Sequence, residues 1–395
     1  MNILITGANF SNKGAQLMLE SLVFSIGKFI PNATIVVSPL LGNDDKLKKL
    51  GIEKLNYPLY HYGNGKNFDY LLKYPWFFSL LLKLKGKVAK GTIELRDIDA
   101  VFDISGFAFG DKWGSLPLYN LAVFARKMKS QGTKFILFPQ AFGSFEKSGM
   151  KESITRVVSE VDLLIARDRQ SYTYITDTIK TEQSNIKLYQ DITLTFYKKI
   201  AIEDGQINLP FVAIVPNERM LDKASASWTN SYVDTMANAI DFILKKSDLN
   251  VLLLIHAQGT SGDAKVGKDI VAKLDSSLSK RVTFFVEEDP VRLKSIIAKA
   301  EFMIGSRFHA LASALSSNVP SIGTSWLHKY EMLFEDYGLK EFSFLEPSDL
   351  ILSKIEALLD HETNNKIRKQ LTEINSTLAS SSERMWQEIK TVLNQ

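Results

Sequence analysis

Arginine, histidine and lysine, three basic residue types with distinct chemistry, occur together in one short stretch of this sequence, Gly305–Glu331 (GSRFHALASALSSNVPSIGTSWLHKYE). An apolar run at Ala300–Ile304 predicts a buried strand, and Arg307 and His309 fall in the first turn of the helix expected to follow it. Backbone N–H groups, a guanidinium and an imidazole at a helix N-terminus suit the binding of an anion. We therefore expect a site for a phosphorylated or carboxylated substrate here.

Lys329 follows the next expected strand, Val319–Gly323. Neighbouring parallel strands end at the same edge of a sheet, where open α/β sheets bind their ligands, so Lys329 is expected to point into the same crevice. The alternative is structural: Arg307 would pair with a core carboxylate and His309 would be a buried histidine with satisfied hydrogen bonds. The position of both residues at a helix start favours a functional role.

A second candidate is ARDRQS at 166–171, which begins where the expected strand Val161–Ala166 ends. Arg167 is predicted to point toward the ligand crevice, with Ser171 beside it as a further substrate contact. Asp168 and Ser171 also suit a helix cap and a first-turn polar group. The alternative is a capping arrangement alone, with the arginines solvated.

Three further loops follow expected strands. In DISGFAFGD (103–111), Gly106 permits close backbone approach, and Asp103 or Asp111 could accept hydrogen bonds from a sugar hydroxyl. The loop Gly7–Gly14, with Asn12, resembles a phosphate-cradling loop but matches neither GxGxxG nor GxxxxGK[ST]. We predict substrate contacts from Gly106, Asp111, Asn12 and Gly14.

The loop HAQGTSGD (256–263) also follows an expected strand. His256 and Gln258 are predicted to contact substrate from it. Turn formation alone would explain the same residue types equally well.

Strands and helices alternate in two successive runs along the chain. This pattern predicts an α/β protein with two Rossmann-like domains facing each other across a cleft. We place the first domain at 1–200 and the second at 207–395, and expect the helical tail Asn364–Leu393 to pack back onto the first. The expected strands are Asn2–Thr6, Ala33–Ser38, Ala100–Ser105, Lys134–Pro139, Val161–Ala166, Phe211–Pro216, Asn250–His256, Arg281–Phe285, Ala300–Ile304 and Val319–Gly323.

One segment of the first domain, about 57–90, is rich in aromatic residues, leucine and lysine. The simpler interpretation is an inserted helical pair that covers the domain. The alternative is an interfacial helix that places Trp76–Phe78 in the headgroup region of a membrane, with lysines near anionic lipid.

Composition excludes several classes of protein. The 395 residues are 45% hydrophobic and 23% charged, with a formal net charge of +4, which argues against a dedicated nucleic-acid binder. The chain has no cysteine, and its five histidines form neither HxxxH nor HExxH, so we expect no metal site. The N-terminus is expected to be a core strand and not a signal peptide, and no apolar run is long enough to span a bilayer. A cytoplasmic protein, with peripheral membrane contact as the alternative, is therefore expected.

Taken together, the motifs resemble those of the polysaccharide pyruvyltransferase family over most of the chain. The chain departs from the family where Asn12-Lys13-Gly14 replaces a Gly-Asp pair and where Gly106-Phe107 replaces Gly-Gly. The motifs that carry the resemblance are, in order, GANFSNKGA, DISGFAFGD, FPQAFGSF at 138–145, ARDRQS, QDITLTF at 190–196, and the Gly305–Glu331 block.

This resemblance implies a fold like that of two-domain GT-B glycosyltransferases. It implies transfer of the enolpyruvyl unit of phosphoenolpyruvate to two hydroxyls of a sugar in a cell-surface polysaccharide or its precursor, with formation of a pyruvate ketal and release of phosphate. No cofactor is implied besides this co-substrate. Arg167, His309 and Lys329 match functional positions of the family, with Arg307 in the phosphate-binding turn. We expect His309 to be the acid/base, Arg307 and Lys329 to bind phosphate, and Arg167 to bind the carboxylate.

Two alternatives stay open at this point. A GT-B glycosyltransferase that uses a nucleotide sugar would share the fold and the anion-binding helix, and Glu331 could be its ribose-binding carboxylate. A non-enzymatic partner that binds a sugar or a lipid carrier through a degenerate site is the other. The acceptor sugar, and whether it is lipid-linked, cannot be read from these residues.

Overall fold

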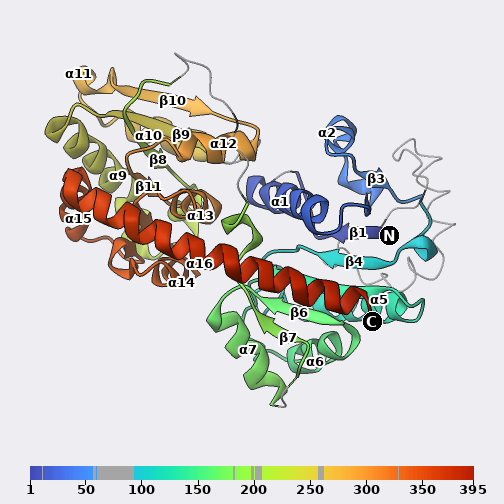
Figure 1. Cartoon of the computed structure of the whole chain (residues 1–395). Helices are drawn as coiled ribbons and strands as arrows, with labels where there is room; N and C mark the ends of the chain where they lie inside the picture. Colours follow the sequence, from blue (N-terminus) through green and yellow to red (C-terminus); the bar gives the residue numbers. More distant parts are fainter. Residues whose placement is uncertain are drawn as a thin grey trace, which may run out of the picture. The chain divides into compact units, whose positions relative to one another are not determined.

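A computed structural model of the chain describes residues 1–10, 12–56, 59, 93–180, 183–196, 200, 207–256, 262–327 and 329–395 (Figure 1). The chain divides into two compact units. The first consists of Met1–Phe10, Met18–Ile192 and Ser380–Gln395, and the second of Ser11–Leu17 and Thr193–Ala379. The expected insertion at about 57–90, including Trp76–Phe78, lies outside the described residues except for Leu59.

The first unit is built on a parallel sheet. Its described strands lie in the order β3-β2-β1-β4-β5-β6-β7. The strand β4 (AVFD) is buried at all four positions, as expected where helices cover both faces of a parallel sheet. The strands are β1 (Asn2–Thr6), β2 (Thr34–Val37), β3 (Glu53–Lys54), β4 (Ala100–Asp103), β5 (Lys134–Gln140), β6 (Leu163–Ala166) and β7 (Ile186–Leu188).

Helices connect these strands and pack on the sheet. Those of the first unit are α2 (Asp44–Lys49), α5 (Leu116–Lys129), α6 (Met150–Glu160) and α7 (Arg169–Ile179), with most of α1 (Lys13–Phe29). The chain ends in the long helix α16 (His361–Leu393), whose last turns belong to this unit. There Trp386 is buried, stacks on Phe29 at a ring-centroid distance of 5.0 Å and lies 5.5 Å from the ring of Phe138.

The second unit repeats the arrangement. Its described strands form a parallel sheet in the order β10-β9-β8-β11-β12-β13. These strands are β8 (Phe211–Val215), β9 (Asn250–Ile255), β10 (Val282–Val286), β11 (Met303–Gly305), β12 (Ser321–Thr324) and β13 (Ser343–Phe344). The helices are α8 (Arg219–Asp222), α9 (Ala226–Lys246), α10 (Asp263–Val271), α11 (Ser276–Ser279), α12 (Pro290–Ile297), α13 (Phe308–Leu315), α14 (Lys329–Asp336) and α15 (Leu350–Leu359).

All ten strands expected from the sequence are present, with ends that shift by up to three residues. The strands β3, β7 and β13 were not expected, because two or three residues carry too little pattern. Between β9 and β10 the chain forms two helices, α10 and then α11, and Asp275 caps the second by accepting a hydrogen bond from the Ser277 N–H at 2.8 Å.

None of the helices in the described part of the chain combines the length and the apolar character that crossing a membrane requires.

Candidate functional site

A group of basic side chains gathers in the second unit, where Lys13, Arg307 and His309 act electrostatically on His256. His256 directly follows β9 and is only 7% exposed. Burial, and then the positive charges of Arg307, His309 and Lys13, hold the pKa of His256 well below its ordinary value of 6.5. We call these four residues the basic cluster. Such a cluster would gain most from an anion placed among its members.

Arg307 lies between β11 and α13, where the backbone turns from an extended into a helical conformation. The sequence placed it in the first helical turn, whereas the structure makes it the residue that precedes the helix, with φ −109° and ψ 122°. An arginine there supplies no oxygen to cap the helix, so α13 begins without a side-chain cap. The positive end of the helix therefore adds to the potential around the cluster.

A buried carboxylate orients the Arg307 guanidinium. Its Nε donates to Asp263 Oδ2 at 2.9 Å, and its Nη2 donates to Asp263 Oδ1. Asp263 is fully buried at the start of α10 and also accepts the backbone N–H of Glu218 at 2.9 Å. The expected alternative, pairing of Arg307 with a core carboxylate, is thus present. The arginine side chain nevertheless keeps 20% of its surface exposed, so the pair leaves it open to a ligand.

The His309 ring lies against the backbone of the first turn of α1. A Cβ atom added at Gly14 would lie 2.1 Å from His309 Nδ1, a distance that no real pair of atoms could keep. On another side the ring meets Phe308 edge to face at a centroid distance of 5.3 Å. Beside Gly14, Lys13 is 7% exposed, and its Nζ donates to the Glu288 carbonyl at 2.8 Å.

Lys329 begins α14, as its position after an expected strand suggested. Its ammonium group lies 5.1 Å from the ring centroid of Phe308 and 5.6 Å from that of Tyr330. Both distances suit cation–π attraction, which holds the charge beside the residue that starts α13.

A buried hydroxyl network fixes the junction that carries Arg307. Ser306 Oγ lies 2.6 Å from the Tyr232 hydroxyl and 2.5 Å from Thr324 Oγ1. The Ser306 carbonyl accepts hydrogen bonds from Asn217 Nδ2 at 2.8 Å and from the Tyr330 hydroxyl at 3.1 Å. Burial raises the pKa of Tyr330 to about 12, so this hydroxyl keeps its proton and donates at neutral pH.

In the first unit, Arg167 follows β6 and is 6% exposed. Its Nη1 donates to Asp191 Oδ2 at 2.9 Å, and both side chains are buried. The alternative of a solvated Arg167 is therefore wrong. The capping interpretation of Asp168 is confirmed, because it accepts the Ser171 N–H at 2.7 Å. The Ser171 hydroxyl in turn accepts the N–H of Phe142 at 2.8 Å, a structural contact between the first turn of α7 and the loop after β5.

Carboxylates of the DISGFAFGD loop also have protein partners. Asp103 accepts hydrogen bonds from Thr6 Oγ1 at 2.6 Å and from Gln140 Nε2 at 2.8 Å. Asp111 accepts the Ser144 hydroxyl at 3.0 Å, as well as two backbone N–H groups of the next loop. Although partial burial acts in the opposite direction, these hydrogen bonds lower the pKa of Asp111. Gly106, in the same loop, has a φ of 75°, which favours glycine.

Asn12 and Gln258 are the other two residues that were predicted to contact substrate. Asn12 is exposed, and its Oδ1 accepts the N–H of Gly14 at 2.8 Å, so it acts as a cap for α1. Gln258 lies outside the described residues, unlike its neighbour His256. The structure thus brings Gly14, His256, Arg307 and His309 together in the second unit. It places Gly106, Asp111, Arg167 and Ser171 in the first.

Sequence reasoning did not single out Lys13, Asp263 or Asn217 as site residues. Lys13 could have been found from its place beside Gly14 at a helix start. Asp263 looks like an ordinary N-terminal helix residue, and nothing local shows that it pairs with an arginine 44 positions away. Asn217 lies just after the end of a strand, and this position was the sequence feature that could have indicated a role in the site.

Comparison with known proteins assigns the chain to a protein family. The family model described as polysaccharide pyruvyl transferase matches residues 12–328. The matched range includes all four residues of the basic cluster and ends one residue before Lys329. Comparison of the sequence with curated proteins gave no significant match.

Solved structures with low sequence identity share the fold. A putative UDP-N-acetylglucosamine 2-epimerase from Listeria monocytogenes is 11% identical, with a TM-score of 0.59 over 99% of this chain and 96% of that one. The S. aureus MnaA–UDP co-structure is 14% identical, with a TM-score of 0.58 over 100% and 97%. Anabaena Alr3699/HepE, in complex with UDP and glucose, is 12% identical, with a TM-score of 0.56 over 99% and 100%. The expected fold class, α/β with two Rossmann-like domains of the GT-B type, is confirmed.

The contact between Gly14 and His309 predicts that a glycine-to-alanine substitution in α1 destabilises the protein at Gly14 but not at Gly27. Gly14→Ala forces the His309 ring away and should lower the free energy of unfolding by about 1–3 kcal/mol, as overpacking does. Gly27→Ala is the control, because an added Cβ there meets nothing within 4 Å. It should be neutral or stabilise by up to about 1 kcal/mol. Urea unfolding and the NMR signals of the His309 ring are the measurements. Equal stabilities and unmoved ring signals in both variants would contradict the contact.

The lowered pKa of His256 predicts a pH dependence of stability. An unfolded histidine titrates near pH 6.5, so below this pH the unfolded chain binds a proton that the folded chain does not. The contribution of His256 to stability is therefore complete above pH 6.5 and is lost as the pH falls toward its folded pKa. When the pH is lowered from 6.5 to 5.5, the unfolding free energy of the wild type should fall further than that of His256→Gln, by up to about 1.4 kcal/mol. His361→Gln, at an exposed position of α16, should follow the wild type. Parallel curves for all three proteins would show the inference to be wrong.

Proposed function

Because the chain belongs to the polysaccharide pyruvyl transferase family, we propose that it moves the enolpyruvyl group of phosphoenolpyruvate onto a sugar of a cell-surface polysaccharide or its precursor. The product is a pyruvate ketal, and phosphate is released. The basic cluster is the observation that supports this proposal, since a dianionic phosphate needs several cationic partners in a fixed arrangement.

The phosphate is proposed to bind between Arg307 and the start of α13. Asp263 fixes the plane of the guanidinium, so the donors of Arg307 are oriented before the substrate arrives. Lys329, held over two aromatic rings next to this helix start, supplies a second cation. Lys13 adds positive charge from the first turn of α1.

The reaction balances with two hydroxyls of the acceptor. The first hydroxyl oxygen bonds to C2 of phosphoenolpyruvate while its proton is transferred, through the site, to C3, which becomes a methyl group. The second hydroxyl oxygen then bonds to C2 as the bond from C2 to the phosphate oxygen breaks, and its proton leaves with phosphate. His309 is proposed to carry these protons, because an imidazole can accept and donate protons near neutral pH.

Arg167 is proposed to bind the substrate carboxylate. The buried Asp191 orients its guanidinium at the end of β6, as Asp263 orients Arg307. Arg167 belongs to the first unit, so this assignment rests on the family resemblance and on the residue's position at a strand end. No cofactor is part of the proposed reaction.

Phosphate release from phosphoenolpyruvate tests this function. The purified protein should release phosphate only when a suitable acceptor is present, and a panel of lipid-linked and simple sugars would identify the acceptor class. His309→Ala should lower the rate by about 10²–10⁴-fold, the usual contribution of a general acid–base group. The matched control is His361→Ala, which removes an exposed histidine of the same unit and should keep the wild-type rate.

Acceptor-dependent release that is equal in wild type and His309→Ala would exclude His309 as the proton carrier. Failure of every acceptor, together with failure of phosphoenolpyruvate to bind, would overturn the donor assignment.

A further inference from the structure

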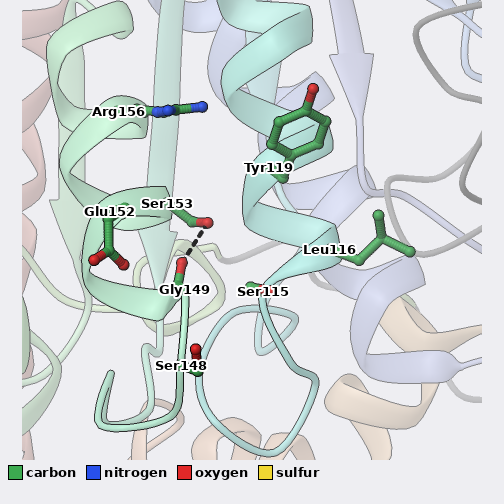
Figure 2. A pocket seen from close by; sticks show the side chains of 8 residues that line it. All are labelled: Ser115, Leu116, Tyr119, Ser148, Gly149, Glu152, Ser153 and Arg156. Carbon is green, nitrogen blue, oxygen red and sulfur yellow. Dashed lines mark hydrogen bonds between the residues drawn. The ribbon is translucent and has the colours of Figure 1, made fainter.

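A pocket of about 440 Å³ opens in the first unit between the starts of α5 and α6 (Figure 2). This volume lies within the range of small-molecule sites, about 300–1,000 Å³. Both helices follow central strands, β4 and β5, and the pocket lies between side chains of their first two turns, of which Tyr119, Glu152 and Arg156 are exposed. It is lined by Ser115, Leu116, Tyr119, Ser148, Gly149, Glu152, Ser153 and Arg156.

The lining combines an aromatic ring with hydroxyl and charged groups. The Tyr119 side chain is 39% exposed on α5, and Arg156 reaches from α6 toward this helix (Figure 2). Ser115 precedes α5, but its hydroxyl does not cap the helix. An aromatic face beside several hydrogen-bonding groups suits a pyranose, which presents C–H groups on its faces and hydroxyls at its edge.

The charged members of the pocket are available to a ligand. Glu152 and Arg156 stand one turn apart on α6, a spacing at which opposite charges often pair. Within the part of the chain that the structure describes, neither of them forms an ion pair, whether with the other or with a third residue. A carboxylate and a guanidinium together can accept from and donate to adjacent hydroxyls of one sugar ring.

The two loops that lead into α5 and α6 are joined to each other by hydrogen bonds. Asp111, in the loop before α5, binds Ser144 and the N–H groups of Glu146 and Lys147 in the loop before α6. A backbone bridge between Phe109 and Phe142 joins the same two loops. Such fixed loops reduce the conformational entropy that binding must overcome.

We propose that this pocket is a carbohydrate subsite that holds a sugar ring of the acceptor, with Tyr119 against a ring face and Arg156 and Glu152 on its hydroxyls. As an acceptor site, the inference rests on the proposed function, whereas carbohydrate binding itself can be measured without turnover.

Saturation-transfer NMR with a panel of neutral hexoses, N-acetylhexosamines and hexuronates tests the subsite. At least one class should give signals with the wild type. Tyr119→Ala and Arg156→Gln should weaken that binding about tenfold or more, as expected when a hydrogen bond to a charged group or a stacked ring is lost. Lys151→Gln is the matched control, since it removes an exposed positive charge from α6 outside the pocket. Thermal melting would verify that each variant is folded.

Absence of signals from the whole panel, or signals that both pocket variants retain, would overturn the subsite. If saccharide binding depended on the pocket but phosphoenolpyruvate yielded no phosphate with any acceptor, the proposed function would fail while the subsite stood.

Discussion

The ion pair between Arg307 and the buried Asp263 is the interaction on which the site depends. The positive charges of Arg307, His309 and Lys13 all act on the buried His256, and such a group of basic side chains is unfavourable without a compensating negative charge. Asp263 supplies this charge from a position with no exposed surface. Removal of one partner from such a pair typically costs about 3–5 kcal/mol, because the other charge stays buried. The pair therefore fixes the direction of the arginine and at the same time makes a basic cluster compatible with a folded core.

The residues around this pair are also held in place by hydrogen bonds and close packing. The hydroxyls around Ser306 hold the turn between β11 and α13, so the backbone that carries Arg307 cannot easily shift. The close approach of Gly14 and His309 fixes the imidazole from another direction. In the first unit, Asp111 and Ser171 tie together loops that follow β4, β5 and β6. Ligand-binding loops held in this way suit chemistry that depends on placing small groups accurately.

The sequence predicted the strands well, and it placed several basic residues directly after strands, for a physical reason. Buried parallel strands are short apolar runs, and polar residues directly after them must lie at the ligand-binding edge. His256, Arg307 and His309 were found in this way. The partners of these residues could not be found, because the pairing of Arg307 with Asp263 and the contact of Gly14 with His309 join distant parts of the chain. Local patterns also cannot tell a carboxylate that binds substrate from one, such as Asp111, that holds two loops together.

The proposal that the basic cluster binds phosphoenolpyruvate and not a nucleotide can be tested by isothermal titration of the wild-type protein with phosphoenolpyruvate and, separately, with UDP. We expect saturable binding of phosphoenolpyruvate that Arg307→Gln weakens strongly, and no comparable binding of UDP. Tight binding of UDP without binding of phosphoenolpyruvate would show that this proposal is wrong and would favour a glycosyltransferase that uses a nucleotide sugar.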